Sequence, residues 1–236
     1  VDAVHCLPGS SGMLGEAICY PNINSSNFSE IIKLIKKNDI DLVVIGPEAE
    51  ITSGLPDQLR QHGIDVFAPS QAAAQLEASK IFSKRFMVEA GVPTARFVEV
   101  SSTSECMEKS RQFDPPFVLK ADGLAAGKGV FICQGPEDLK IAATHLFDEK
   151  VFGEAGARAI LEEHQEGWEI SYLVITNGVE YKPLPLSQDH KRLKDKDEGP
   201  NTGGMGTVGP LKIDLDLEEA IHREILKPTI DKIKEK

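Results

Sequence analysis

A glycine-rich turn between two apolar segments constrains the fold of this chain more strongly than any other feature. Residues 117–122 read FVLKAD and residues 130–133 read VFIC, and both segments are typical of β-strands. Glycines in the turn let backbone amides face a ligand, and lysines add positive charge. These residues are Gly123, Gly127, Gly129, Lys120 and Lys128. They predict a β-hairpin whose turn binds phosphate; a surface turn with two solvated lysines is the alternative.

The turn does not match the P-loop of nucleotide-binding proteins. A P-loop has four residues between its first glycine and a Gly-Lys pair, then Ser or Thr, then a helix. Here three residues separate Gly123 from Gly127, Gly129 replaces the hydroxyl residue, and a strand-like segment follows. A P-loop kinase is therefore a distant alternative.

The first part of the chain alternates strand-like and helix-like segments, which predicts an α/β layer with a parallel sheet. The strand-like segments are 1–7, 41–48 and 64–68. Asn27 and Glu30 form a capping box before one helix, and a second helix covers 56–62. The composition of DLVVIGPE at 41–48 predicts a strand buried on both faces.

The second part predicts a different mixture of elements. Ser79 is expected to cap a helix that ends at Gly91, and Asn177-Gly178 predicts the tight primed turn of a hairpin. Residues 187–209 are polar, rich in glycine and without periodicity, which predicts a long functional or disordered loop. The chain closes with an amphipathic helix that opens near Asp216 and is interrupted at Pro228.

Composition and charge exclude several classes of protein. The net charge of -11 provides no overall basic surface for nucleic acid, and no apolar run is long enough to cross a bilayer. The four cysteines lack the spacing of metal ligands, and Cys133 is expected to be a buried hydrophobic residue. We expect a protein of the reducing cytoplasm that binds neither nucleic acid nor membrane. The cysteines are Cys6, Cys19, Cys106 and Cys133.

Three other places are candidates for a nucleotide site. Lys80 at the start of a helix is a second candidate phosphate ligand, although a solvated helix residue is the simpler interpretation. Residues 161–165 follow a strand and offer backbone groups to adenine. Glu169 is a candidate for the ribose hydroxyls, although a strand glutamate is usually just exposed.

Together these residues resemble the ATP-grasp superfamily and, within it, the family of phosphoribosylamine–glycine ligases. The resemblance covers most of the chain, and its segments keep the family's order. Its most specific part is QDHKR followed by PNTGGMG, which other ATP-grasp members lack. The segments are IGPEAEITSG (45–54), AAAQLEASKIFSKRFM (72–87), VPTA (92–95), LKADGLAAGKGV (119–130) and QDHKRLKDKDEGPNTGGMG (188–206).

The resemblance implies a role for each matching residue. Lys80 and Lys120 would hold the ATP phosphates, and the Gly123–Gly129 turn with Lys128 would close over them as a lid. Adenine would meet the backbones of two residues, with Glu162 beside them, and Glu169 would face the ribose. The two adenine residues are Glu163 and Gln165.

The resemblance also implies a pocket for the other substrates. The implied catalytic residues are Asp189, His190 and Lys191. The implied substrate-binding residues are Asn201, Thr202, Gly203, Gly204, Met205, Gly9, Gly46, Pro47 and Glu48. A charged surface loop at 188–192 and a turn-rich linker at 200–206 are the alternatives. Three glycines in seven residues cost chain entropy, which favours a backbone that contacts a ligand.

The implied fold is mixed α/β and α+β. It comprises an N-terminal parallel-sheet domain (1–97), an ATP-grasp lid subdomain (98–167) and an incomplete central subdomain (168–236). The implied reaction joins glycine to 5-phosphoribosylamine with ATP and Mg²⁺ or Mn²⁺, in a monomer or weak homodimer. Another carboxylate–amine ligase and a non-catalytic nucleotide-binding module are the alternatives.

Two departures from the family concern the ends of the chain. The family's first strand and Gly-rich turn do not occur here, and its magnesium-binding Glu and Asn come after the helix that ends this sequence. We therefore expect a fragment with little ligase activity of its own, and we assign no metal ligand within residues 1–236.

Overall fold

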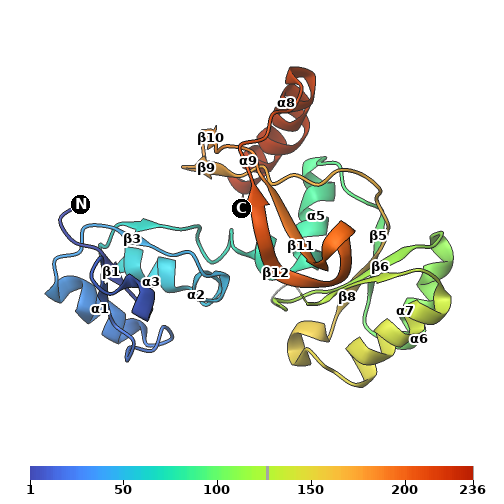
Figure 1. Ribbon diagram of the computed structural model, residues 1–236, viewed down its shortest axis with the longest axis horizontal. Coiled ribbons are helices and arrows are strands. Elements are labelled where there is room, and N and C mark those ends of the chain that lie inside the picture. Colours follow the sequence, from blue (N-terminus) through green and yellow to red (C-terminus); the bar gives the residue numbers. More distant parts are fainter. Residues whose placement is uncertain (126–127, 236) are drawn as a thin grey trace. The chain divides into compact units, whose positions relative to one another are not determined.

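The computed structural model describes residues 1–125 and 128–235, and only the backbone of residues 197, 200 and 201. The chain forms two compact units, Val1–Gln75 and Leu76–Lys236 (Figure 1). Helices and strands occur in both units, so the structure is mixed α/β as expected.

The first unit contains two parallel strand pairs and three α-helices. β1 (His5–Cys6) pairs with β2 (Ile18–Cys19), and β3 (Val43–Val44) pairs with β4 (Val66–Phe67). The helices are α1 (Phe28–Lys37), α2 (Glu48–Thr52) and α3 (Leu55–Gln61), and a 3-10 turn covers Ser11–Met13. The core of the unit comprises Ile31, Ile35, Leu55, Leu59 and Ile64. The predicted parallel pairing is confirmed.

The capping box before α1 is confirmed in a modified form. The Glu30 amide donates to Asn27 Oδ1 at 3.3 Å, while Asn27 Nδ2 donates to Glu30 Oε2 at 3.0 Å. The glutamate therefore meets the side-chain amide of the cap residue rather than its backbone. This start places Ile31 and Ile35, one turn apart, in the core.

The prediction that residues 41–48 form a strand buried on both faces is wrong. β3 extends over only two residues, and Val44 is 66% exposed. In its two-stranded sheet β3 has β4 as its partner, so the strand has a neighbour on one edge instead of the two of a central strand. The apolar composition correctly indicated a strand. It did not indicate whether other elements would pack on both faces of that strand.

The second unit is built on a four-stranded antiparallel sheet in the order β5-β8-β6-β7. The strands are β5 (Phe97–Val100), β6 (Phe117–Ala121), β7 (Val130–Cys133) and β8 (Ala159–Glu163). Lys120 lies opposite Val130, which confirms the predicted hairpin around the glycine-rich turn. Helices α6 (Thr103–Lys109) and α7 (Pro136–Ala143) contact the sheet and each other (Figure 1), and α5 (Lys80–Ala90) contacts β8.

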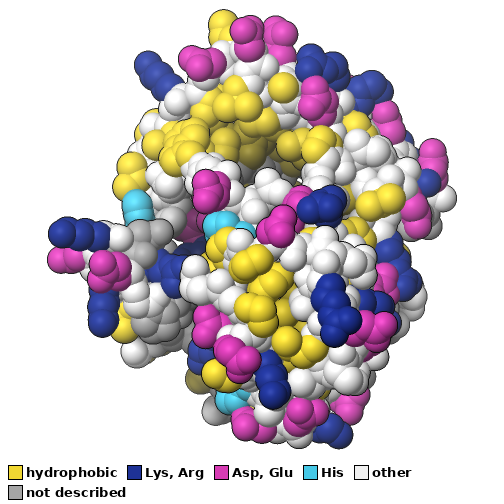
Figure 2. All heavy atoms as spheres, turned by 90° about the vertical axis from the view of Figure 1, so that its right-hand side faces the viewer, with side chains coloured by type: hydrophobic (Ala, Val, Ile, Leu, Met, Phe, Trp, Pro, Cys, Tyr) yellow, Lys and Arg dark blue, Asp and Glu magenta, His cyan; other side chains and the backbone are white. Residues whose placement is uncertain are grey.

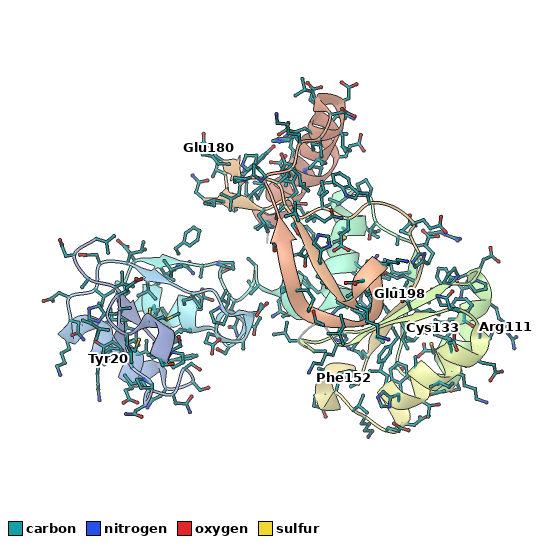
Figure 3. All side chains as sticks on the ribbon, viewed as in Figure 1. Tyr20, Arg111, Cys133, Phe152, Glu180 and Glu198 are labelled. Carbon is teal, nitrogen blue, oxygen red and sulfur yellow. The ribbon has the colours of Figure 1, made fainter. Side chains whose placement is uncertain are left out.

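The core of the second unit lies between this sheet and its helices. Leu119 from the sheet and Leu139 and Leu146 from the helical side are fully or almost fully buried. Cys133 lies where β7 leads toward α7 (Figure 3) and is buried, as predicted. All four cysteines are free thiols. Desolvation raises the pKa of Cys106 to about 12 and that of Cys133 to about 11, so both behave as apolar residues.

Helix α5 (Lys80–Ala90) begins and ends at the residues predicted for it. The Ser79 hydroxyl accepts a hydrogen bond from the Phe82 amide at 3.0 Å. Gly91 ends the helix with φ of +70°, a left-handed conformation that glycine adopts without a steric cost. A short helix, α4 (Gln75–Ala78), precedes α5.

The predicted hairpin at Asn177-Gly178 is confirmed, but its tight primed turn is wrong. β9 (Val174–Thr176) pairs with β10 (Tyr181–Pro183), and the last pair is Thr176 with Tyr181, so residues 177–180 form a longer connection. Asn177 Oδ1 accepts from the amides of Val179 and Glu180 at 2.9 and 2.8 Å. Hydrogen bonds to the Asn177 side chain therefore stabilise this connection, in place of the backbone geometry of a two-residue turn.

The predicted long loop at 187–209 is wrong, because this segment is a β-hairpin. β11 (Gln188–Lys194) pairs with β12 (Glu198–Val208) in antiparallel fashion, with register shifts on both sides of Arg192. The described side chains of both strands are exposed or half-exposed. Neither strand buries a face, so the sequence carries no apolar alternation by which to recognise it.

The chain ends in a helical segment that changes its winding before Pro228, close to the predicted interruption. The segment comprises α8 (Leu215–Ile221), a π-helical turn (His222–Leu226) and α9 (Lys227–Ile233). Proline lacks the amide that would bond four residues back, and the Lys227 amide bonds five residues back to His222. Further 3-10 or π turns cover Ser110–Gln112, Thr144–Asp148, Gly153–Gly156 and Asp195–Asp197.

Charged side chains of both signs are interspersed on the face that Figure 2 shows, around a hollow lined by hydrophobic groups. The acidic excess of the chain is therefore not gathered into one patch on that face. Within residues 1–125 and 128–235, every helix is too short or too polar to pass through a bilayer.

Replacing Leu119 with alanine tests the core of the second unit. Leu119 is fully buried in the central strand β6, so Leu119→Ala should lower the free energy of unfolding by about 2–5 kcal/mol. Ile132→Ala on the neighbouring strand is the control, because Ile132 is 41% exposed and should cost about 1 kcal/mol or less. Denaturant titration measures both values, and equal losses would contradict this core.

Candidate active site

A buried carboxylate between two lysines forms the centre of the candidate site. Glu162 on β8 is only 4% exposed. Val118 on β6 lies opposite Glu162, so Lys120, two residues further along β6, projects from the same face. Lys120 pairs with Glu162 Oε1, and Lys84 Nζ lies 2.6 Å from Oε2. Two cations on one carboxylate leave a local excess of positive charge.

The two lysines differ in what remains free to bind a ligand. Lys84 is buried and also donates to Thr94 Oγ1 at 2.7 Å and to the Ala95 carbonyl at 3.2 Å. The Lys120 side chain is 29% exposed, and Glu162 is its ion-pair partner. Lys84 therefore neutralises the buried carboxylate, while Lys120 keeps donors for an anion.

Lys80 is the first residue of α5 and lies at the start of the glycine-rich turn. Its ammonium group donates to the Gly123 carbonyl at 3.4 Å. Burial lowers the pKa of Lys80, an effect that the negative charges of Glu77 and Asp122 oppose. The structure therefore brings Lys80 to the turn that follows the Lys120 strand.

Asp122 joins these two elements, and the sequence did not single it out. Its Oδ1 accepts from Ser79 Oγ at 2.7 Å and from the Ile81 amide at 2.9 Å. Its Oδ2 accepts from Arg158 Nη2 at 2.8 Å, and its carbonyl accepts from the Lys80 amide at 3.0 Å. An aspartate after a strand was the available signal, but the helix that it caps lies some forty positions earlier in the sequence.

Two glycines of the turn, Gly123 and Gly129, pack so closely against neighbouring residues that a side chain would not fit. A Cβ atom on Gly123 would lie 2.8 Å from Ala155, and one on Gly129 would lie 2.8 Å from the Ala125 Cβ. The Gly123 amide donates to the Ala155 carbonyl at 3.0 Å, so it is not directed at a ligand here. Lys128 is exposed, and Gly127 lies outside the described residues. The role of the turn as a lid stays a prediction.

The segment expected to meet adenine is held by Arg96. Glu163 Oε1 accepts from the Arg96 amide at 2.9 Å and Oε2 from Arg96 Nε at 2.7 Å. These hydrogen bonds lower the pKa of Glu163. The Glu163 amide donates to the Arg96 carbonyl at 3.1 Å, so this donor is already used, and Gln165 Nε2 donates to Glu163 Oε1 at 2.8 Å. Adenine binding by Glu163 and Gln165 stays a prediction.

Two other residues with predicted roles meet around one lysine of β11. Lys191 Nζ lies 3.2 Å from Glu169 Oε1 and 3.3 Å from Asp189 Oδ2. Desolvation lowers the pKa of Lys191, but the hydrogen bonds to these two carboxylates prevail and raise it. His190 is exposed and, as the residue between Asp189 and Lys191 on the strand, projects to the other side.

A bulge in β12 faces Lys191. His190 pairs with Gly206 and Arg192 with Asn201, so Thr202–Met205 lie opposite Lys191 alone. Thr202 Oγ1 donates to the Lys191 carbonyl at 2.9 Å and accepts from the Gly204 amide at 3.1 Å. Gly204 has φ of +130°, and Gly203 and the exposed Met205 complete the bulge. The structure thus brings most of the predicted catalytic and substrate-binding residues of this hairpin together.

The remaining predicted residues lie in the first unit. Gly9 follows β1 with φ of +75°, and a Cβ atom there would lie 2.5 Å from Cys19 Sγ. Gly46 and Pro47 lead from β3 into α2, whose first residue is Glu48, and all three are exposed. Both turns follow the carboxyl ends of parallel strands, where α/β proteins bind ligands.

Comparison with protein-family models identifies both units. The model of the phosphoribosylglycinamide synthetase ATP-grasp (A) domain matches residues 78–236, and the model of the N domain of the same synthetase matches residues 1–77. The chain belongs to the phosphoribosylglycinamide synthetase family.

Individual relatives agree with this family. The phosphoribosylamine–glycine ligase of Clostridium acetobutylicum is 40% identical over 239 residues, which cover 100% of this chain and 56% of the relative. The chloroplastic enzyme of Arabidopsis thaliana is 39% identical, over 97% of this chain and 44% of its own. The crystal structure of the Thermotoga maritima ligase matches with a TM-score of 0.84 and 34% identity, over 99% of this chain and 56% of that one.

The chain thus spans about half the length of the synthetases that it matches. The mixed α/β architecture and the ATP-grasp fold expected from the sequence are confirmed by the family model and by the Thermotoga structure. Compactness divides the chain after Gln75, and the family models divide it after residue 77.

Replacing Lys84 tests the charge arrangement at Glu162. Lys84→Met leaves the buried carboxylate with one cation and should lower the free energy of unfolding by about 3 kcal/mol. The double variant Lys84→Met/Glu162→Gln should regain part of this loss, because the unpaired charge is gone. Thermal and urea unfolding measure both. A double variant no more stable than the single one would contradict the proposed dependence on charge.

Proposed function

We propose that this chain provides the ATP-binding part of a ligase that joins glycine to 5-phosphoribosylamine. The observation that carries the proposal is the partly exposed side chain of Lys120, held by the buried Glu162 inside a region that matches an ATP-grasp domain. A fixed cation with free donors suits a triphosphate, and Lys80 at the neighbouring helix start provides a second. The fold and the family support the proposal that the chain binds ATP. The other two substrates are proposed from the names of the relatives.

The proposed reaction has two balanced steps. The carboxylate oxygen of glycine attacks the γ-phosphorus of ATP, the bond to the β-γ bridging oxygen breaks, and ADP leaves. The amine of phosphoribosylamine then attacks the carbonyl carbon of glycyl phosphate and loses a proton as phosphate leaves with the bonding electrons. The products are glycinamide ribonucleotide, ADP and phosphate. Phosphoryl transfer depends on positioning and charge neutralisation, which lysines supply without a covalent intermediate on the protein.

The contacts described above support a proposed role for several single residues. We assign Lys80 and Lys120 to the phosphates of ATP and the Gly123–Gly129 turn to closure over them, since acyl phosphates require protection from water. The carboxylates of Glu169 and Asp189 with Lys191, and the bulge that faces them, are assigned to the ribose and the acceptor substrates. We retain the subdivision into 1–97, 98–167 and 168–236 as part of the proposal.

Magnesium is the metal that we propose to accompany ATP. Within the described ranges, 1–125 and 128–235, no group of three or more His, Cys, Asp or Glu side chains is placed to hold an ion. The proposed roles above do not depend on the metal site. The proposed location is the cytoplasm, and the proposed partners are small molecules.

The decisive experiment measures ADP formation by a chain extended to the length of the matched synthetases. We expect ADP release that requires both glycine and phosphoribosylamine. Release with another amino acid or another amine would indicate a different carboxylate–amine ligase. Nucleotide binding without any turnover would contradict catalysis and would indicate a binding module.

Replacing Lys120 tests the phosphate site in the 236-residue chain itself. Lys120→Ala removes a charge-assisted contact and should weaken ATP binding by about tenfold or more. Glu162 keeps Lys84 as its partner, so the variant should remain folded. Lys140→Ala, an exposed lysine on α7, is the matched control and should bind ATP as the unmodified chain does. Calorimetry that finds equal affinities for both variants would remove Lys120 from the site.

A further inference from the structure

Three donors from other segments of the chain surround the carboxylate of Asp122, which follows the strand before the glycine-rich turn. It is 7% exposed, and both of its carboxylate oxygens accept hydrogen bonds. A buried carboxylate is costly unless donors surround it, so these contacts need to be kept together. The donors come from the start of α5 and from the residue before β8, and Asp122 itself follows β6.

The contacts fix the first turn of α5 against the end of β6. The Ile81 amide and the Ser79 hydroxyl both donate to Oδ1, and the Lys80 amide donates to the Asp122 carbonyl. The first amides of a helix lack partners within the helix, and a carboxylate there also favours its dipole. Asp122 therefore serves as a cap for a helix from a distant part of the sequence.

This cap lies between the two proposed phosphate ligands. Lys120 is two residues before Asp122 on β6, and Lys80 is the helix residue whose amide Asp122 binds. A triphosphate that contacts both ammonium groups requires a fixed separation between them, because ordering loose side chains costs affinity. Ser79 and the Ile81 amide, on either side of Lys80, are the groups that Asp122 holds.

We infer that Asp122 is a positioning residue that sets the separation of Lys80 and Lys120 for the phosphates of ATP. The inference rests on the proposed ATP site, since it assigns no new ligand. Arg158 has a supporting part: its side chain is 58% exposed and donates to Asp122 Oδ2, whereas Ser79 and the Ile81 amide bind Oδ1. Removing Asp122 should therefore disturb nucleotide binding far more than removing Arg158.

The test compares three variants of the whole chain by calorimetry with ATP. Asp122→Ala should weaken binding by about tenfold or more, and Arg158→Ala by about threefold or less. Leu119→Ala controls for lost stability, because it weakens the same unit and its side chain projects from the face of β6 opposite to that of its neighbour Lys120. All are measured at a temperature where unfolding curves show each variant folded. Equal losses of affinity in Asp122→Ala and Leu119→Ala would overturn the inference.

A second measurement separates this inference from the ATP proposal. Hydrogen exchange without nucleotide should become at least about tenfold faster at the first amides of α5 in Asp122→Ala, and should stay unchanged there in Arg158→Ala. Unchanged exchange in Asp122→Ala would overturn the inference whether or not the chain binds ATP. Faster exchange in a chain that shows no ATP binding at all would instead contradict the proposed function and confine Asp122 to capping the helix.

Discussion

Glu162 carries a negative charge at a position with almost no access to water, and much of the second unit is arranged around that charge. Lys84 from α5 and Lys120 from β6 approach it from two elements that are far apart in sequence. Lys84 in turn holds Thr94 and the Ala95 carbonyl, so the connection from α5 to β5 is tied to the same carboxylate. This group of charges thus links α5, the sheet and the connection between α5 and β5. It also orients Lys120, the more exposed of the two lysines.

The candidate site extends this arrangement through polar contacts rather than through a deep apolar cavity. Asp122 fixes the start of α5, Arg96 fixes the strand end at Glu163, and Lys191 gathers Glu169 and Asp189. In each case one charged side chain joins segments that the sequence separates. Such contacts have defined geometry, which is what a site for phosphate and carboxylate groups requires.

The sequence predicted the parts of the molecule whose signals are local. The cap at Asn27, the ends of α5 at Ser79 and Gly91, and the hairpin around the glycine-rich turn each depend on neighbouring residues. The hairpin at 188–208 was missed because its strands bury no face, and Asp122 was missed because its partners are distant in sequence. Residues of the candidate site could be named through family resemblance, whereas the contacts among them required the structure.

The bulge in β12 has a mechanical consequence. Strand pairing fixes the backbone at Asn201 and at Gly206, so the residues between them form an arch whose two ends are paired with β11. Two glycines in this arch supply backbone torsional freedom. The arch can therefore change its curvature toward Lys191 while the strand pairs on both sides of it stay in register, and the described hydrogen bond that such a change would affect is the one from Thr202 Oγ1 to the Lys191 carbonyl.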